Sequence, residues 1–263
     1  MRSILFFISW ALPLLVESAP QSSTRPGKPP VHVAPPTKFG MVIYPAFTAL
    51  DVFGPLDIFN AMSMTTSLNL SILSTTLDPV STHHEMEGIT GNFGESILPT
   101  HTFDNAPDDI EVLFVPGGPA TLFEGPHLDA HVAFIKRVYP KLRYLITVCT
   151  GSALVARTGI LDGLRATSNK QVWSWAVAQG PRVKWIGKAR WVHDRNIWTT
   201  SGVSAGIDGT FDFVRTVYGK EKALEIANGL EYEQQFDWRN DPFADLYNAT
   251  DVFPALFPIT EGK

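Results

Sequence analysis

Short apolar runs alternate with helix-like segments along most of this 263-residue chain. The runs at residues 39–44, 110–116 and 144–148 have the length and apolar character of strands buried on both faces. Between and after them, segments such as 122–138 and 206–218 place apolar residues at helical spacing. Strands interleaved with helices predict an α/β fold, in which a doubly wound and mostly parallel sheet carries helices on both faces.

Weaker patterns extend this alternation. We expect further strands at residues 68–74 and 196–201, and further helices at 150–158 and 221–233. The segment 50–62 also has helical spacing, but the Gly-Pro pair in its centre predicts a break or a kink.

The chain is long enough for one sizeable α/β core and short for two. We therefore expect one domain over residues 38–250 and a C-terminal tail over 251–263. The net charge of −5 argues against nucleic acid as a partner. A single cysteine excludes both an internal disulfide and a multi-thiolate metal site. His83 and His84 are interpreted as loop residues because adjacent side chains on regular elements point apart, so no metal is expected.

Residues 1–19 have the layout of a secretory signal peptide. Arg2 precedes an apolar run at 4–16, and the small residues Ser18 and Ala19 follow it. The run is shorter than the ~20 residues that span a bilayer, so we expect no stable membrane anchor. An uncleaved anchor is the alternative.

Residues 20–37 are rich in proline and serine, which predicts a linker without a core of its own. Asn69 and Asn248 each begin an N-glycosylation triplet, as in proteins that enter the secretory route. We therefore expect a glycoprotein of the secretory pathway or the extracellular space.

Cys149, the only cysteine, stands where an apolar run stops and a run of small residues begins. Ligands of such sheets bind beyond the carboxyl ends of the strands, and a strand-to-helix turn presents its side chain outward. A helix N-terminus there is expected to lower the pKa of the thiol. An inert buried cysteine is the alternative, and the position favours a nucleophile.

Four motifs carry a resemblance to a known family. The sequence reads FVPGG at 114–118 and VCTGSALVARTGILDGLRAT at 148–167, and both segments resemble the DJ-1/PfpI superfamily. The Cys-Thr pair, LDVFGP at 50–55 and SGVSAGID at 201–208 are similar to its isocyanide (isonitrile) hydratase branch. The resemblance covers residues 39–243. It implies a flavodoxin-like domain of the DJ-1/PfpI type, usually a homodimer, that works without a cofactor.

The resemblance also implies roles for particular residues. The family's nucleophile matches Cys149, its essential acid matches Asp51, and its threonine beside the cysteine matches Thr150. Groups that bind substrate or a developing negative charge are expected at Gly117, Gly118 and Gly151.

The sequence departs from the related hydratases after the cysteine helix, and the role of Asp51 has an alternative. Asn169 stands where the related hydratases have histidine, and Lys170 follows it. Asparagine cannot transfer a proton near neutral pH, which puts any histidine-dependent step in doubt. From its residue type alone, Asp51 is equally suited to cap a helix. Asp57, on the same segment, is interpreted as a solvated or capping residue.

The implied activity is that of a hydro-lyase acting on a small isocyanide. A thiolate can attack the electrophilic terminal carbon of an isonitrile and form a thioimidate. A carboxylic acid beside the thiol can supply protons and then activate water, which yields an N-substituted formamide. A place in isocyanide natural-product metabolism follows from the resemblance alone.

Other classes of function stay open. Another cysteine-dependent hydrolase or glyoxalase is one, although such members usually carry histidine where this chain has Thr150. A non-catalytic redox-sensing or binding protein with an oxidisable Cys149 is another. Some transcription regulators share the motifs but continue into a helix-turn-helix region, which we do not expect here. Five tryptophans are interpreted as core rather than pocket residues: Trp173, Trp175, Trp185, Trp191 and Trp198.

Overall fold

The computed structural model describes residues 34–83, 91 and 93–254. The chain divides into a unit Met1–Ala34 and a unit Pro35–Lys263, and the second holds the helices and strands of the described residues. The predicted signal peptide, most of the predicted linker, His84 and residues 255–263 of the predicted tail lie outside the described residues. Among those described, no helix is both long and apolar enough to cross a bilayer.

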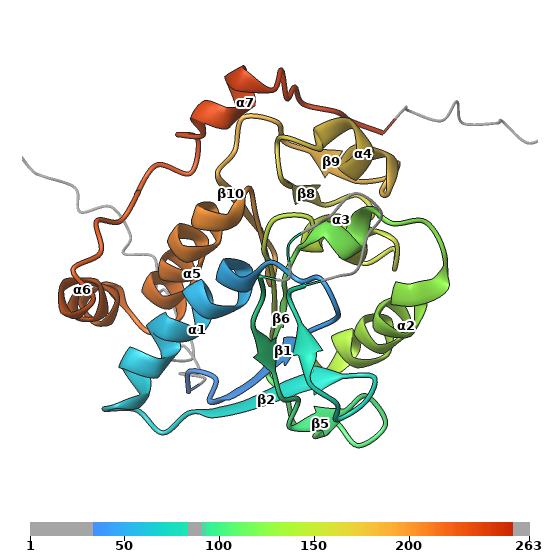
Figure 1. The fold of residues 1–263 in the computed structure, drawn as a ribbon. Helices are drawn as coiled ribbons and strands as arrows, with labels where there is room; N and C mark the ends of the chain where they lie inside the picture. Colours follow the sequence, from blue (N-terminus) through green and yellow to red (C-terminus); the bar gives the residue numbers. More distant parts are fainter. Residues whose placement is uncertain (1–33, 84–90, 92, 255–263) are drawn as a thin grey trace, which may run out of the picture. The chain divides into compact units, whose positions relative to one another are not determined.

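Seven strands form the main sheet of the described part, and all run parallel except β10, at one edge (Figure 1). In sheet order they are β10 (Trp191–Asp194), β11 (Ile197–Thr200), β7 (Tyr144–Thr147), β6 (Val112–Val115), β1 (Lys38–Val42), β2 (Asn69–Ser74) and β5 (His101–Thr102). The chain leaves β1 in one direction through β2 and β5, and later builds the other half through β6, β7 and β11. The switch point therefore lies between β1 and β6, and the predicted doubly wound, mostly parallel sheet is confirmed.

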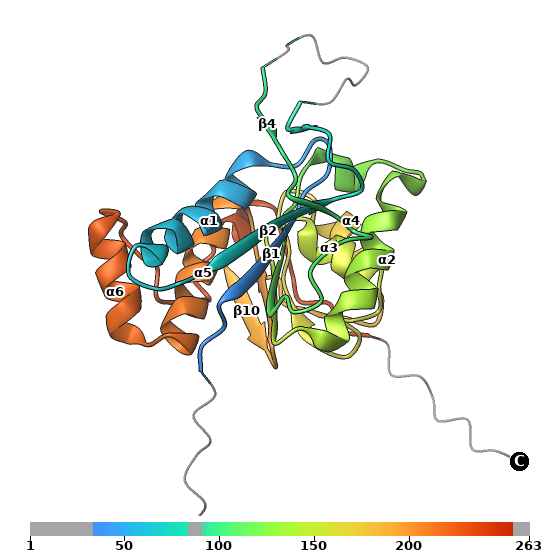
Figure 2. The same ribbon diagram turned by 90° about the horizontal axis from the view of Figure 1, so that it is seen from below.

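Helices cover both faces of this sheet (Figure 2). One face carries α1 (Ala49–Ser63), α5 (Val203–Val217) and α6 (Lys220–Gly229), with α5 packed against both others. The other face carries α2 (Asp129–Val138) and α3 (Gly151–Ala156). The smaller elements are the strand pairs β3 (Val80–Ser81) with β4 (Ser96–Ile97) and β8 (Arg165–Ala166) with β9 (Lys184–Trp185), the helices α4 (Trp173–Ala178) and α7 (Pro242–Leu246), and the 3-10 turns Pro119–Leu122, Pro126–Leu128 and Tyr139–Lys141.

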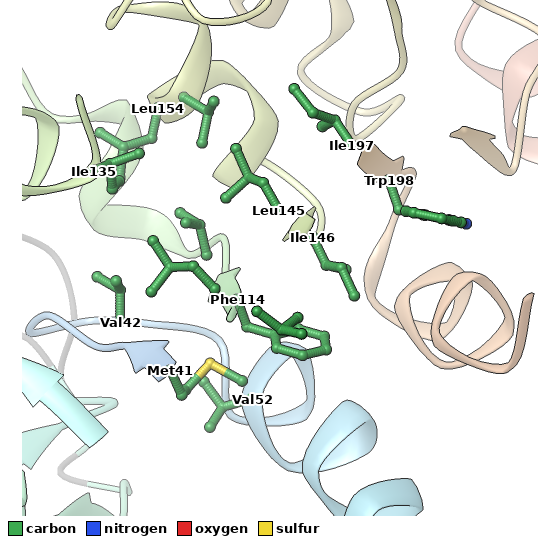
Figure 3. Packing of buried hydrophobic residues seen from close by; sticks show 14 of the residues in the cluster. Met41, Val42, Val52, Phe114, Ile135, Leu145, Ile146, Leu154, Ile197 and Trp198 are labelled. Atoms are coloured by element: carbon green, nitrogen blue, oxygen red, sulfur yellow. The ribbon is translucent and has the colours of Figure 1, made fainter. Parts of the chain in front are cut away.

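The core follows from the alternation of side chains along each strand (Figure 3). Met41 of β1 lies on the side of Val52 from α1. Its neighbour Val42 lies on the opposite side, with Ile135 of α2 and Leu154 of α3. Because both faces are apolar, the strands read as continuous hydrophobic runs in the sequence.

Four of the five tryptophans belong to this core, which confirms their interpretation: Trp173, Trp185, Trp191 and Trp198. Their bulk fills the interior, and the indole N–H groups of three of them donate to oxygen atoms of the protein. Trp175 is only half-buried and is not part of the core, so its interpretation as a core residue is wrong.

Two helix predictions need correction. The segment around Gly54 and Pro55 forms one continuous helix, α1, with Pro55 inside it. A Cβ on Gly54 would lie 2.8 Å from Ile207, so glycine is what lets α1 approach α5. The helix expected over 122–138 begins only at Asp129, because Gly125 adopts a left-handed φ of 108° and starts a separate 3-10 turn.

Candidate active site

Cys149 sits on a strained turn at the carboxyl end of β7. Its φ of 57° lies in the left-handed region, which residues other than glycine rarely adopt. The turn leads directly into α3, as in nucleophile elbows, where strain presents the side chain at the end of a sheet. The side chain is nevertheless buried, with only 6% of the residue exposed.

Glycines let the turn pack tightly against the neighbouring strand β6. A Cβ on Gly151 would lie 2.3 Å from the carbonyl oxygen of Val115, and one on Gly117 would lie 2.6 Å from the nitrogen of Thr150. Both distances are far inside van der Waals contact. The two glycines are therefore required for the elbow to rest on the end of β6.

Asp51 is brought to the same place by α1. The N-cap of α1 is Thr48, and Asp51 lies three residues later with its carboxyl group turned inward. Its Oδ2 accepts a hydrogen bond of 2.9 Å from the backbone N–H of Gly117. Its Oδ1 is buried and makes no hydrogen bond within the described residues. The helix-cap alternative for Asp51 is therefore wrong, whereas Asp57 is exposed as interpreted.

The carboxyl and thiol groups perturb each other. Burial raises the pKa of Asp51 to about 7, against the opposing effects of the Gly117 N–H and the Cys149 thiol. Burial and the Asp51 charge raise the pKa of Cys149 to about 12. The expectation of a lowered thiol pKa is wrong, because desolvation and a neighbouring carboxylate outweigh the short helix α3. Between about pH 7 and pH 12 the pair therefore carries one proton, held by the thiol.

Tyr44 completes the inner wall of the site. Burial, and then the charges of Asp51 and Cys149, raise its pKa well above its usual range. Its hydroxyl donates to the carbonyl oxygen of Pro116 at 2.6 Å. Tyr44 therefore stays neutral and acts as a fixed donor behind the pair.

The backbone N–H groups of the three predicted glycines already have partners. Gly117 donates to Asp51, Gly118 donates to Thr150 Oγ1 at 3.1 Å, and Gly151 donates to the carbonyl of Val148. In this structure these bonds hold the parts of the site together, and the predicted role of the three glycines toward a developing negative charge stays a prediction. Near the thiol, the N–H of Thr150 is the backbone donor that lowers the pKa of Cys149.

Hydrogen bonds to its side-chain hydroxyl hold Thr150 in place. Its Oγ1 accepts from Gly118 N–H and from the hydroxyl of Thr121, at 2.8 Å. Gly118 has a φ of 152°, and a Cβ there would lie 2.4 Å from the carbonyl oxygen of Ala46. Only glycine allows this close crossing of two loops.

Asn169, noted in the sequence only as a departure from histidine, contacts the nucleophile. Its Nδ2 donates to Cys149 Sγ at 3.2 Å. Its Oδ1 accepts from the backbone N–H of Gln171 at 2.9 Å, which fixes the orientation of the amide. Donation to sulfur favours the thiolate and lowers the pKa of Cys149. The position in the motif was the only signal that pointed to it.

Lys170, the second departure, has a structural role. It is 2% exposed, and its Nζ donates to Thr167 Oγ1, to the carbonyl oxygens of Ser168 and Ala189, and pairs with Asp241 at 3.5 Å. Burial lowers its pKa to about 8, against the opposing charge of Asp241. It anchors the C-terminal segment to the loop that carries Asn169.

A cavity of about 300 Å³ opens beside the site. Asn169, which donates to the thiol, also lines this cavity. Leu50, next to Asp51 in α1, lines it as well. No cluster of three or more metal-ligating side chains occurs within the described residues.

Comparison with known proteins places the chain among relatives of two kinds. An isonitrile hydratase of Pseudomonas putida is 28% identical over 197 residues, which cover 74% of this chain and 78% of that enzyme. The HTH-type transcriptional regulator GbdR of Pseudomonas aeruginosa is 30% identical over 141 residues, covering 54% of this chain and 37% of the regulator.

A solved structure of a ThiJ/PfpI family protein from Pseudomonas syringae matches with a TM-score of 0.63 and 27% identity, over 82% of this chain and 84% of that one. The model of the DJ-1/PfpI family matches residues 38–217, from the first strand to the end of α5. With its cysteine elbow on a parallel sheet, the chain belongs to the DJ-1/PfpI family.

Proposed function

We propose that this protein is a hydratase that adds water to isonitriles and releases N-substituted formamides. The observation that carries the proposal is the buried pair of Cys149 and Asp51, in which one carboxyl oxygen has no hydrogen-bond partner in the part of the chain that the structure describes. Such an arrangement supplies a nucleophile and a proton carrier in one place. The isonitrile hydratase of Pseudomonas putida, as a relative, supports the choice of reaction.

In the first step, Cys149 Sγ attacks the terminal carbon of the isonitrile. The thiol proton passes to Asp51 as the carbon–sulfur bond forms, and Asp51 delivers it to the same carbon. The product is a neutral thioimidate, which holds every atom of the thiol and the substrate. A carboxyl group with a pKa of about 7 suits this relay, because it gains and loses a proton readily near neutral pH.

In the second step, water attacks the thioimidate carbon. Asp51 takes one proton from the water and gives a proton to the nitrogen, so that a tetrahedral adduct forms. The carbon–sulfur bond then breaks, and the remaining hydroxyl proton returns to sulfur through Asp51. The formamide leaves, and the thiol and the carboxylate are restored.

The other groups of the site assist this sequence by position. The Gly117 N–H holds Oδ2 of Asp51 and leaves Oδ1 free to exchange protons. Asn169 and the N–H of Thr150 stabilise negative charge on sulfur during attack and departure. The absence of histidine at position 169 is compatible with this sequence because Asp51 alone moves the protons.

The proposal is tested by assaying a panel of small isonitriles and following formamide by NMR. Cys149→Ala is expected to abolish turnover and to leave the circular dichroism spectrum unchanged. Residual activity within about tenfold of the wild type, a change of only ~1.4 kcal/mol in barrier, would rule out covalent catalysis.

We also propose that residues 1–19 direct the chain into the secretory route and that the mature protein is a homodimer. Asn69 and Asn248 are both exposed, which makes them accessible to glycosylation. Expression with a C-terminal tag is expected to yield a shortened N-terminus, glycosidase sensitivity and a dimer by light scattering. An intact N-terminus in cytosolic protein would contradict the export.

A further inference from the structure

The cavity beside Asn169 is lined by both polar and apolar residues. The polar lining includes Ser201, directly after β11, and Ser204, in the first turn of α5. Arg190, directly before β10, and Asn169 also belong to it. The apolar lining comes from Leu50, Val203, Phe243 and Tyr247. Its volume, about 300 Å³, is at the small end of the range for ligand pockets and suits a single ring with short substituents.

The charged groups at the cavity wall are already neutralised. Arg190 pairs with buried Asp208 at 2.7 Å, and the other oxygen of Asp208 accepts from the hydroxyl of Tyr232. Lys170, the second cation in the lining, pairs with buried Asp241. A charged ligand would lose its hydration without meeting an unmatched opposite charge, which is unfavourable.

One polar atom of a residue in this lining makes no hydrogen bond within the described residues. Ser201 is 1% exposed, and its Oγ has no hydrogen bond within the described part of the chain. Leaving a buried hydroxyl unpaired costs stability unless something satisfies it. Because Ser201 lines the cavity, a bound molecule can supply that partner.

We infer that this cavity receives the substituent of the isonitrile, and that this substituent is a neutral ring carrying one hydrogen-bonding group for Ser201. The inference rests on the proposed function for the isonitrile end of the ligand. The part of the inference that concerns the ring rests on the volume and lining of the cavity and does not depend on the reaction. Asn169 joins the two because it touches both the thiol and the cavity.

The test uses alkylation of Cys149, which needs no hydratase activity. N-Phenyl iodoacetamide is compared with its ortho, meta and para hydroxyl derivatives and with a carboxylate derivative, all at one pH. Dividing each rate by the rate with glutathione removes differences in intrinsic reactivity. All probes react with the same Cys149 thiolate at the same pH, so the fraction of thiolate does not affect the ratio of their rates.

In the wild type, at least one hydroxyl probe is expected to react about 3- to 10-fold faster than the parent, the usual worth of one hydrogen bond. The carboxylate probe is expected to react more slowly than the parent. If no hydroxyl isomer exceeds the parent, recognition by Ser201 is wrong. If the carboxylate probe is the fastest, the neutral class is wrong.

Ser201→Ala is expected to abolish the preference for the hydroxyl probe. Thr147→Val is the matched control, because Thr147 Oγ1 is also buried without a partner but does not line the cavity. The control is expected to keep the preference. An unchanged preference in Ser201→Ala would overturn the inference.

A second measurement needs only the wild type. A hydroxyphenyl formamide is expected to protect Cys149 from unsubstituted iodoacetamide at a several-fold lower concentration than phenyl formamide, and equal protection would overturn the inference. Preserved probe selectivity without isonitrile turnover would refute the proposed function and leave the cavity inference standing. Isonitrile turnover without any preference among the probes would refute the cavity inference and leave the proposed function standing.

Discussion

Replacing Asp51 with asparagine separates its chemical role from its structural cost. Asparagine keeps the shape of the side chain and can still accept the Gly117 N–H, but it cannot carry a proton. If Asp51 relays protons, Asp51→Asn is expected to lower the rate by about 10²–10⁴-fold, the usual contribution of general acid–base catalysis. Formamide production followed by NMR measures this loss.

The same substitution is expected to stabilise the fold in a pH-dependent way. Burial raises the pKa of Asp51 from 3.8 to about 7, so between these values the folded state binds more protons than the unfolded state. The free energy of unfolding of the wild type therefore falls as pH rises through this window. One pKa unit corresponds to about 1.4 kcal/mol, so the total loss is up to about 4 kcal/mol. Asparagine has no such dependence.

Urea unfolding at pH 4.5 and pH 8 measures the difference. Asp51→Asn is expected to gain stability over the wild type at pH 8 and to gain little at pH 4.5. Asp57→Asn, on the exposed side of the same helix, is the control and is expected to change neither rate nor stability appreciably. An active Asp51→Asn protein, or a stability difference that does not vary with pH, would refute the reasoning.

Three further substitutions test the packing of the site. Gly118→Ala is expected to destabilise more than Gly163→Ala in thermal unfolding, since both have positive φ but only at Gly118 would the new Cβ clash. Asn169→Asp is expected to raise the thiol pKa further and slow alkylation at pH 8, and unchanged alkylation would remove Asn169 from the thiol environment. Lys170→Met is expected to cost about 3–5 kcal/mol in denaturant unfolding by leaving Asp241 buried and unpaired, and a neutral result would show that the pair contributes little.

Several features of this protein could be predicted from local sequence alone. The alternation of apolar runs with helical patterns indicated the α/β class, because strands buried on both faces must be apolar along their whole length. The position of Cys149 between a strand and a helix indicated an elbow, and the structure confirms it with a left-handed turn. These are properties of consecutive residues, and consecutive residues are what a sequence displays.

Other features depended on contacts between segments far apart in the chain. Only the hydrogen bond from Gly117, 66 residues away in the sequence, distinguished Asp51 from a helix-capping residue. Asn169 reaches the thiol only because the loop after β8 returns over the end of β7. The same holds for α1, whose Gly-Pro pair predicted a break, whereas close packing on α5 keeps the helix continuous.

The thiol pKa shows most plainly why the tertiary structure was needed. The sequence placed Cys149 at a helix start, and that local effect favours the thiolate. Burial and a carboxylate from another element act in the opposite direction and are larger. Desolvation depends on everything that surrounds an atom in space, so its magnitude, and here the sign of the pKa shift, was decided only when the chain had folded.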